Sequence, residues 1–404
     1  MEREFTVLRD LARAFPTDPF RGAGPAIAGD TVEAAAVAAP QVERMTLDKA
    51  DLRDVVREPD VRAVAPVMPI TLIRPVPSSE LDGAAEPAAE PGPTWGVRAV
   101  GADVSARTGA GVTVAVLDTG IDASHPAFTG VELVQKDFSG DGDGDGQGHG
   151  THCAGTVFGR DVDGTRIGVA PGVTRALIGK VLGNDGSGTS NAIFEGIQWA
   201  VQQGADVISM SLGFDFPGLV DQLISGGWPA DLATSAALEG YRANLRMFDA
   251  LMGYVRANAP FGRGTVLVAA AGNESKRTVD PRYEIAVSIP AAAEGVVSVG
   301  ALAEGGSGLS IAPFSNTFPL VAAPGVAVLS AQAGTSGLVA LNGTSMATPH
   351  VAGVLALWWE EVLASPLPQT ATTVTAQLLA NADLGALAAD VDVADRGAGL
   401  VKAP

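Results

Sequence analysis

The chain contains, at residues 112–120, the stretch Val-Thr-Val-Ala-Val-Leu-Asp-Thr-Gly, an apolar run that ends on a carboxylate and a glycine turn. Comparable apolar runs recur at 175–182, 207–212, 265–271 and 295–301, and helical patterns separate them. Fully apolar strands that alternate with helices are typical of a parallel sheet buried on both faces. We therefore predict an α/β fold with a mostly parallel sheet and helices on both of its faces.

Polar side chains stand at the ends of three of these predicted strands. They are Asp118, Ser211 and Asn273. Active sites of open α/β sheets lie beyond the carboxyl ends of the strands. We therefore expect these three residues to face one site.

Two further glycine-rich segments carry groups that complement Asp118. They are Gly148-His149-Gly-Thr-His-Cys-Ala-Gly and Gly343-Thr-Ser345-Met-Ala-Thr-Pro-His. An imidazole accepts a proton near neutral pH, and a carboxylate buried at a strand end needs such a partner. Ser345 precedes the apolar run 351–359, so it begins a helix whose N-terminus favours a developing negative charge. Together the three residues supply the acid, base and nucleophile of a serine-based acyl transfer.

The three segments, in the order Asp, His, Ser, closely resemble those of the subtilase family of serine peptidases. The resemblance extends from about Trp95 to the end of the chain and implies a subtilisin-like fold. It implies Ser345 as nucleophile, His149 as general base and then acid, and Asp118 as the group that orients His149. Asn273, within Ala269-Ala-Ala-Gly-Asn-Glu, matches the asparagine of the oxyanion hole, which it shares with the Ser345 N–H. No cofactor is required for this chemistry.

The same resemblance assigns the specificity pocket. Two backbone segments flank the pocket and a third forms its floor: Ser211, Leu212 and Gly213; Ala270, Ala271 and Gly272; and Ser288 within Val287-Ser-Ile-Pro290. Extended backbone at these positions offers main-chain hydrogen bonds to an extended polypeptide substrate. Small residues with no aligned acid favour an apolar residue before the cleaved bond, unless Asp280 or Glu284 from the preceding insertion enters the pocket.

The other three histidines and the single cysteine have structural roles in this resemblance. His152 and His350 occupy structural positions of the matching motifs, and His125 resembles a surface-loop residue. Cys153 matches a cysteine that packs behind the catalytic histidine and is not a nucleophile. With one cysteine the chain forms no internal disulfide.

The loop before His149 carries alternating carboxylates, Asp141, Asp143 and Asp145. Alternate carboxylates can converge on one hard cation, so the loop is a candidate for a structural calcium site. The alternative is a solvated acidic turn, because His152 stands where an EF-hand pattern has its closing glutamate. Ala127 also replaces an aspartate ligand that many subtilases carry after Ser-His-Pro.

Residues 1–75 have the pattern of a separate small α+β domain. We predict a strand at 4–9, a helix at 49–58 opened by the Asp48 cap, and a strand from residue 61. The helix and the following Glu58-Pro-Asp-Val-Arg-Ala-Val resemble the end of the subtilase propeptide, a chaperone and inhibitor whose tail lies in the active-site cleft. An unrelated α+β cap is the alternative.

The rest of the chain divides into a linker and a peptidase domain. Residues 76–94 are rich in Pro, Ala and Glu, which predicts an exposed linker with a processing site, and 95–404 form the peptidase domain. An insertion at about 214–263 departs from the family. It contains a predicted amphipathic helix at 238–255 and a loop at 214–229, which either narrows the cleft, contacts a partner or pads the core.

Composition limits the partners. A net charge of −19 opposes nonspecific binding of nucleic acid, and no run of 18 apolar residues indicates a membrane span. The charged first ten residues lack the apolar core of a secretory signal. We therefore expect a cytoplasmic protein if the chain is complete, and a secreted one if a leader has been removed.

We expect a serine endopeptidase that hydrolyses polypeptides through an acyl-enzyme and is made as a self-processing zymogen, with its own N-terminal domain as intramolecular inhibitor. Two alternatives use the same scaffold. One is a transpeptidase or macrocyclase, in which an amine replaces water in deacylation. The other is a permanently capped regulatory binding protein.

Overall fold

The computed structural model describes residues 2–10, 40–81, 90–258 and 263–404. In this part of the chain an eight-stranded sheet has the order β15-β14-β13-β11-β6-β9-β7, with β16 beside β14. Neighbouring strands run parallel except for the β14–β15 pair. The strands are β6 (Thr113–Asp118), β7 (Glu132–Asp137), β9 (Arg175–Lys180), β11 (Val207–Met210), β13 (Val266–Ala270), β14 (Val297–Ala303), β15 (Ser310–Ile311) and β16 (Val321–Pro324).

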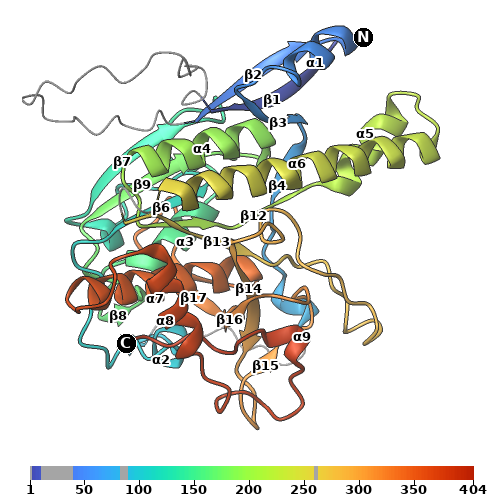
Figure 1. Cartoon of the computed structure of the whole chain (residues 1–404). Coiled ribbons are helices and arrows are strands. Elements are labelled where there is room, and N and C mark those ends of the chain that lie inside the picture. The colour runs from blue at the N-terminus through green and yellow to red at the C-terminus, as the bar shows by residue number, and fades with distance from the viewer. Residues whose placement is uncertain (1, 11–39, 82–89, 259–262) are drawn as a thin grey trace, which may run out of the picture.

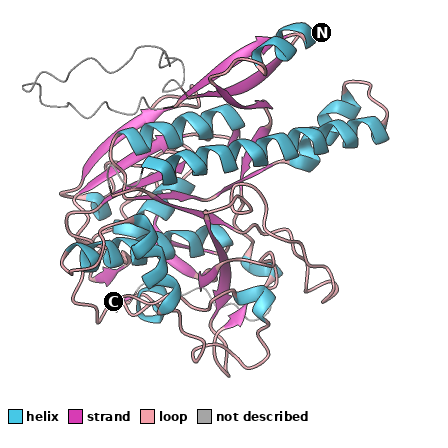
Figure 2. Ribbon diagram, in the orientation of Figure 1, coloured by secondary structure: helices cyan, strands magenta, loops and turns pink. Residues whose placement is uncertain are grey.

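Helices cover both faces of this sheet (Figures 1 and 2), which confirms the predicted α/β fold. One face carries α3 (His149–Phe158), α7 (Thr344–Leu363) and α8 (Ala371–Ala380), and the other carries α4 (Ser190–Gln202) and α6 (Ala230–Asn258). The short helix α2 (Trp95–Ala99) lies near the C-terminus in Figure 1, and the short helix α9 (Val393–Arg396) belongs to the last residues of the chain. None of the helices in the described residues is long and apolar enough to cross a membrane.

Strand β6 shows how the sequence builds the two layers. Successive side chains of a strand point to opposite faces, so an apolar run serves two cores. Val114 and Val116 pack into the core beneath α3 and α7, whereas Ala115 and Leu117 pack into the core beneath α4 and α6. Asp118 then ends the strand at the edge where α3 begins.

The N-terminal unit is a three-stranded antiparallel sheet with one helix. β1 (Arg3–Arg9) lies between β2 (Gln41–Leu47) and β3 (Val61–Pro66). α1 (Lys49–Val55) begins at the predicted cap, because Asp48 Oδ1 accepts from the N–H of Ala50 and of Asp51 at 2.7 and 2.9 Å. Alternation in β1 again serves two cores: Val7 packs within the unit, and Leu8 joins the core beneath α4 and α6. The unit is therefore docked on the larger body through apolar side chains.

Three details of this unit differ from the prediction. α1 ends at Val55 rather than at Glu58, because Glu58 precedes a proline and such a residue disfavours the helical conformation. β2 was not predicted. The strand from residue 61 is interrupted, since β3 ends at Pro66 and β4 (Pro69–Leu72) belongs to another sheet.

The insertion forms a helical hairpin that extends from the body (Figure 1). The predicted amphipathic helix is confirmed as part of α6, but the predicted loop at 214–229 is wrong because it contains α5 (Phe216–Ser225). Asp215 caps α5 by accepting from the Gly218 N–H at 2.8 Å, and Pro217 stands in its first turn.

The hairpin also contacts the N-terminal unit. The guanidinium of Arg3 lies 5.3 Å from the ring centre of Trp228, and Asn244 Nδ2 donates to the carbonyl of Pro66 at 2.9 Å. The insertion therefore supports the docked position of β1 and β3.

The predicted linker is only partly a linker. Residues 82–89 lie outside the described residues. Before them, η2 (Ser78–Glu80) is followed by Leu81, which is buried in the core beneath α7. After them, β5 (Gly92–Pro93) pairs with β8 (Thr165–Arg166). The expectation of a fully exposed linker over 76–94 is therefore wrong, because both of its ends pack on the body.

Candidate active site

Asp118 and His149 form a buried pair at the carboxyl edge of the central sheet. Asp118 ends β6 and is 1% exposed, and His149 begins α3 and is 2% exposed. His149 Nδ1 lies 2.8 Å from Asp118 Oδ1, which also accepts from the Thr119 N–H at 2.8 Å. The carboxylate therefore holds the Nδ1 proton and leaves Nε2 as the acceptor.

The carboxylate decides the protonation behaviour of His149. Burial is the largest single influence and lowers the pKa of His149, but Asp118 and Cys153 beside the ring together raise that pKa well above 6.5. The Cys153 Sγ lies 3.7 Å from His149 Nδ1. Burial raises the pKa of that thiol, so Cys153 stays neutral at neutral pH.

Ser345 lies in the first turn of α7 and is fully buried. Its backbone carbonyl accepts from Ser211 Oγ at 3.1 Å and from the thiol of Cys153 at 3.5 Å. Its Oγ donates to the carbonyl of Ile73 at 3.0 Å. His149 Nε2 is buried and has no hydrogen-bond partner among the described residues. The structure thus brings Asp118, His149 and Ser345 together, but the serine hydroxyl is turned to Ile73 and not to the imidazole.

Asn273 follows β13 and faces the same site. Its Oδ1 accepts from the N–H and the hydroxyl of Thr344, at 2.9 and 2.8 Å. These two bonds orient the side-chain amide, and Nδ2 donates to the carbonyl of Arg74 at 3.0 Å. The amide donor is therefore aimed at a peptide carbonyl beside Ser345.

The carbonyls that meet Ser345 and Asn273 belong to the chain itself. We call residues 69–76 the cleft segment. Its first part, β4, lies between β10 (Ser187–Thr189) and β12 (Leu212–Phe214) and is antiparallel to both. The Leu72 N–H also donates to the carbonyl of Gly186 at 2.9 Å. The cleft segment therefore crosses the site as an added central strand.

The predicted specificity residues divide into two groups. Gly213 pairs with Thr71, and Leu212 with Leu72. A Cβ added to Gly213 would lie 3.5 Å from both the Ile73 side chain and Ser288 Oγ, so the side chain of Ile73 lies close to both Gly213 and Ser288. The second group hydrogen-bonds to the peptidase body instead. Ala270 and Ala271 bond to β14, and the Gly272 N–H donates to the hydroxyl of Thr344.

Beyond Arg74 the cleft continues. The Val76 N–H donates to the carbonyl of Asn342 at 2.8 Å, and Asn342 Nδ2 donates to the carbonyl of Val76 at 2.9 Å. A hollow of about 510 Å³ lies beside Pro75 and His149 and is also lined by Gln147, Val339 and Leu341. The cleft segment therefore continues past the Ile73 carbonyl that faces Ser345 and is held on its far side by Asn342.

Comparison with known proteins decides the family. The sequence profile described as the Subtilase family matches residues 109–399, which is most of the chain. The chain belongs to the subtilase family. Subtilisin DY from Bacillus licheniformis is 36% identical over 257 residues, which cover 62% of this chain and 77% of that protein. Subtilisin BL from Lederbergia lenta is 33% identical over 298 residues, which cover 69% of this chain and 91% of that protein.

A third relative extends the match. The thermostable alkaline protease of Halalkalibacterium halodurans is 32% identical over 317 residues, which cover 77% of this chain and 70% of that protein. The subtilase described here is thus a member of a family of serine proteases.

The remaining histidines of this subtilase are structural. His152 Nε2 lies 3.0 Å from the carbonyl of Val328, and burial lowers the pKa of His152 to about 3. Burial likewise lowers the pKa of His350 to about 4. The expectation of a surface position for His125 is wrong: it is 2% exposed, because its Nδ1 accepts from the Ala127 N–H and caps η3 (Pro126–Phe128).

The acidic loop of this subtilase does not gather its carboxylates. Within the described residues, the ligand atoms of Asp141, Asp143 and Asp145 do not lie together closely enough to form a metal cluster. Asp141 Oδ2 accepts from the Asn184 N–H at 2.8 Å. Asp145 accepts from five donors, and a carboxylate offers about four lone-pair sites, so it has none left for a cation. The geometry therefore gives the calcium expectation no support.

Two parts of the site were missed from the sequence. β10 and Gly186 form one of the two edges that hold the cleft segment, and Asn342 holds its far end. The stretch Gly183-Asn-Asp-Gly-Ser-Gly188 begins shortly after β9, which ends at Lys180, so a glycine-rich turn at the carboxyl edge of the sheet was the available signal. Asn342 gave no local signal, because its partner lies 266 residues away in the chain.

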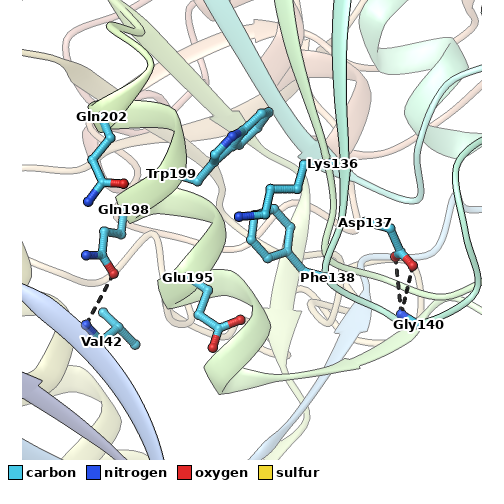
Figure 3. Close-up of a pocket in the computed structure, with 9 residues that line it drawn as sticks. All are labelled: Val42, Lys136, Asp137, Phe138, Gly140, Glu195, Gln198, Trp199 and Gln202. Atoms are coloured by element: carbon cyan, nitrogen blue, oxygen red, sulfur yellow. Dashed lines mark hydrogen bonds between the residues drawn. The ribbon is translucent and has the colours of Figure 1, made fainter.

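A second hollow, of about 560 Å³, lies away from the triad (Figure 3). It is bounded by Val42 of β2, by Glu195, Gln198 and Trp199 of α4, and by Lys136 and Phe138. Gln198 Oε1 accepts from the Val42 N–H at 3.2 Å, which ties β2 to α4 at one end of the hollow. This hollow marks the seam between the N-terminal unit and the peptidase body.

Proposed function

We propose that this subtilase is a serine endopeptidase in which Ser345 is the nucleophile, His149 the general base and then acid, and Asp118 the carboxylate that orients His149. One observation carries the proposal. The buried Asp118–His149 pair, at 2.8 Å, stands beside a serine Oγ that faces a peptide carbonyl at 3.0 Å. That is the set of groups a serine acyl transfer requires.

The steps follow from the positions of these groups. When a substrate replaces the cleft segment, the free Nε2 of His149 accepts the proton of Ser345 as Oγ bonds to the substrate carbonyl carbon. The electron pair of the C=O bond moves to oxygen, where Asn273 Nδ2 and the Ser345 N–H donate to it. As the C–N bond breaks, His149 gives its proton to the departing amine. Water then repeats the sequence on the acyl-enzyme and releases the acid.

The cleft segment indicates how a substrate binds. Its backbone pairs with β10 and β12, so we propose an extended polypeptide as substrate. Its side chains at Ile70, Leu72 and Ile73 are 1%, 3% and 4% exposed. We therefore propose that apolar residues precede the cleaved bond, with Ser288 and Gly213 at the pocket that Ile73 now fills.

We also propose that residues 1–75 form an intramolecular inhibitor and that 95–404 form the peptidase domain. The cleft segment engages both reactive donors, but on different carbonyls: Ser345 Oγ on Ile73 and Asn273 Nδ2 on Arg74. Attack requires both donors on one carbonyl, so the segment blocks the site in this position, and it is cut only when the Ile73 carbonyl moves to where Asn273 Nδ2 also reaches it. Because the Ile73 carbonyl is the one that faces the nucleophile, we propose Ile73–Arg74 as the processing bond, just before the predicted linker.

Intact mass and peptide hydrolysis test this function. We expect the wild-type chain to lose residues 1–73 and to hydrolyse an apolar peptide substrate, and Ser345→Ala to stay full length with a turnover about 10⁶-fold lower. Ser310→Ala, on the distant strand β15, is the matched control and should behave as wild type. Hydrolysis retained by Ser345→Ala contradicts the proposal.

The same masses separate the alternatives. Each hydrolytic cut adds one water, whereas a transpeptidase or macrocyclase joins fragments with no water added. A permanently capped binding protein leaves wild type and Ser345→Ala both full length and both inactive.

A further inference from the structure

The acidic loop before His149 contacts both elements that carry the acid–base pair. Asp145 Oδ1 accepts from the hydroxyl of Thr119 at 2.8 Å and from the Gly148 N–H at 2.7 Å. Its Oδ2 accepts from the N–H and the hydroxyl of Thr151 at 2.8 and 2.6 Å. Thr119 directly follows Asp118, and Gly148 and Thr151 lie on either side of His149. One carboxylate therefore joins the turn after β6 to the first turn of α3.

Thr119 extends this connection. Its hydroxyl donates to Asp145 and accepts from the Gly150 N–H at 2.9 Å, and its own N–H donates to Asp118 Oδ1 at 2.8 Å. The hydroxyl thus links the residue after Asp118 to the residue after His149. Fixing these two neighbours fixes the distance between the paired side chains.

The backbones of the same segments touch. A Cβ at Gly120 would lie 2.1 Å from the carbonyl oxygen of Gly144, and a Cβ at Gly150 would lie 2.2 Å from that of Gly120. Both distances are far below van der Waals contact, so only glycine fits at these two positions. The turn, the loop and the start of α3 therefore form one rigid contact with no side chain between them.

The buried side chain of Lys180 also holds this contact. Lys180 of β9 is the strand partner of Asp118 and is 2% exposed. Its Nζ donates to the carbonyls of Thr119 and Gly144 at 2.6 and 3.1 Å, and to Asn184 Oδ1 at 2.8 Å. The cation holds the same turn and the same loop that Asp145 and Gly120 bring together.

We propose that Asp145 is a positioning residue of the peptidase reaction, which sets the separation of Asp118 and His149 through Thr119 and Thr151. This inference rests on the proposed function. Asp145 does not touch substrate, and it acts by holding the turn after β6 against α3. A misplacement of about 1 Å in a catalytic pair can cost about 10²-fold in rate, which is the scale of effect that the contact controls.

Two matched pairs of variants test the proposal. Asp145→Asn keeps the shape but places an amide where one carboxylate oxygen accepts two bonds, and Asp137→Asn makes the same charge change in the same loop. Among the described residues, the carboxylate of Asp137 accepts hydrogen bonds from Ser139, Gly140 and Gly142 and from neither β6 nor α3, so it is the control. Thr119→Val removes the linking hydroxyl without changing charge, and Thr119→Ser keeps it.

We expect kcat per titrated active site to fall about 10- to 100-fold in Asp145→Asn and Thr119→Val, with KM nearly unchanged. Asp137→Asn and Thr119→Ser should retain kcat within about twofold. The acid limb of the pH profile of kcat should move to lower pH in Thr119→Val, because a loosened Asp118 raises the pKa of His149 less. The other groups facing His149, Cys153 and His152, are neutral at these pH values, so they do not cause that movement.

Three outcomes overturn the inference. One is a wild-type kcat and pH profile in both Asp145→Asn and Thr119→Val, even if their thermal stability falls. Another is an equal loss of kcat in Asp137→Asn, which assigns the effect to loop charge. The third is a wild-type kcat that excess EDTA lowers to the value of Asp145→Asn. That result would assign Asp145 to calcium binding. An inactive wild type instead contradicts the proposed function and is seen before any variant is compared.

Discussion

The two sides of the active site differ in how complete they are. On one side, Asp118 and His149 are paired at 2.8 Å, and the contacts that hold them come from the peptidase body. On the other side, Ser345 Oγ and Asn273 Nδ2 both donate to the cleft segment. The Asp118–His149 side is thus assembled within the body of the chain, whereas the Ser345–Asn273 side is occupied by the chain's own N-terminal region.

This difference arises at the cleft segment. The segment accepts hydrogen bonds from the hydroxyl of Ser345 and the side-chain amide of Asn273, and it leaves His149 Nε2 without a partner among the described residues. We therefore expect removal of the segment to leave the Asp118–His149 pair in place and to free the hydroxyl of Ser345 to turn toward the imidazole.

The largest effect is expected on the assembled side. Asp118→Asn should lower kcat by about 10⁴-fold, because the amide no longer holds the productive tautomer of His149. The carboxylate raises the pKa of His149 well above 6.5, so His149 is protonated and inactive as a base below that pKa. The acid limb of wild-type activity should therefore lie above pH 6.5, and the residual activity of Asp118→Asn should have its acid limb at lower pH. Steady-state rates measured across pH, with the surface variant Asp161→Asn as control, check both the fall in kcat and the shift of the acid limb. If the acid limb of Asp118→Asn stays at the wild-type pH, the assignment of Asp118 as the partner of His149 is contradicted.

A smaller effect is expected on the occupied side. Asn273→Ala removes one oxyanion donor and should lower kcat by about 10²- to 10³-fold with a small change in KM. The same change removes the hydrogen bond to Arg74, so the full-length chain should also release its cleft segment more readily. Single-turnover rates and limited proteolysis measure these two effects separately, with the exposed Asn381→Ala as control. A loss in KM alone would mean that Asn273 only binds substrate.

The smallest effect is expected from weakening the docking seam between the two regions. Met68 is 1% exposed and packs in the core shared with α4 and α6. Truncation to Ala at a buried site costs about 2–5 kcal/mol, and each 1.4 kcal/mol is about tenfold in an equilibrium. Met68→Ala should therefore speed the appearance of activity in the full-length chain by about tenfold or more, measured as the lag in peptide hydrolysis. Leu238→Ala, at an exposed position of α6, should keep the wild-type lag. The same lag in wild type, Met68→Ala and Leu238→Ala would argue that docking of the N-terminal unit does not delay activity.

Much of the architecture followed from local pattern. The apolar runs predicted the buried strands β6, β9, β11, β13 and β14, because such runs serve two cores only in a sheet covered on both faces. The Asp48 cap predicted the start of α1, since that carboxylate satisfies N–H groups of its own first turn. What failed was also local: α5 lies in a stretch predicted to be a loop, although the Asp215 cap and Pro217 in the first turn are local signals of a helix start.

The sequence by itself determined the identities and order of Asp118, His149, Ser345 and Asn273, because each lies in a short motif at the end of a strand or the start of a helix. Only the tertiary structure decided which carbonyls these groups meet. The pairing of Ser345 with Ile73 joins residues 272 apart, and that of Asn273 with Arg74 joins residues 199 apart. It also decided that Asp145 accepts hydrogen bonds from the turn after β6 and from the start of α3. Contacts of this kind depend on how separate elements pack, and no local periodicity records them.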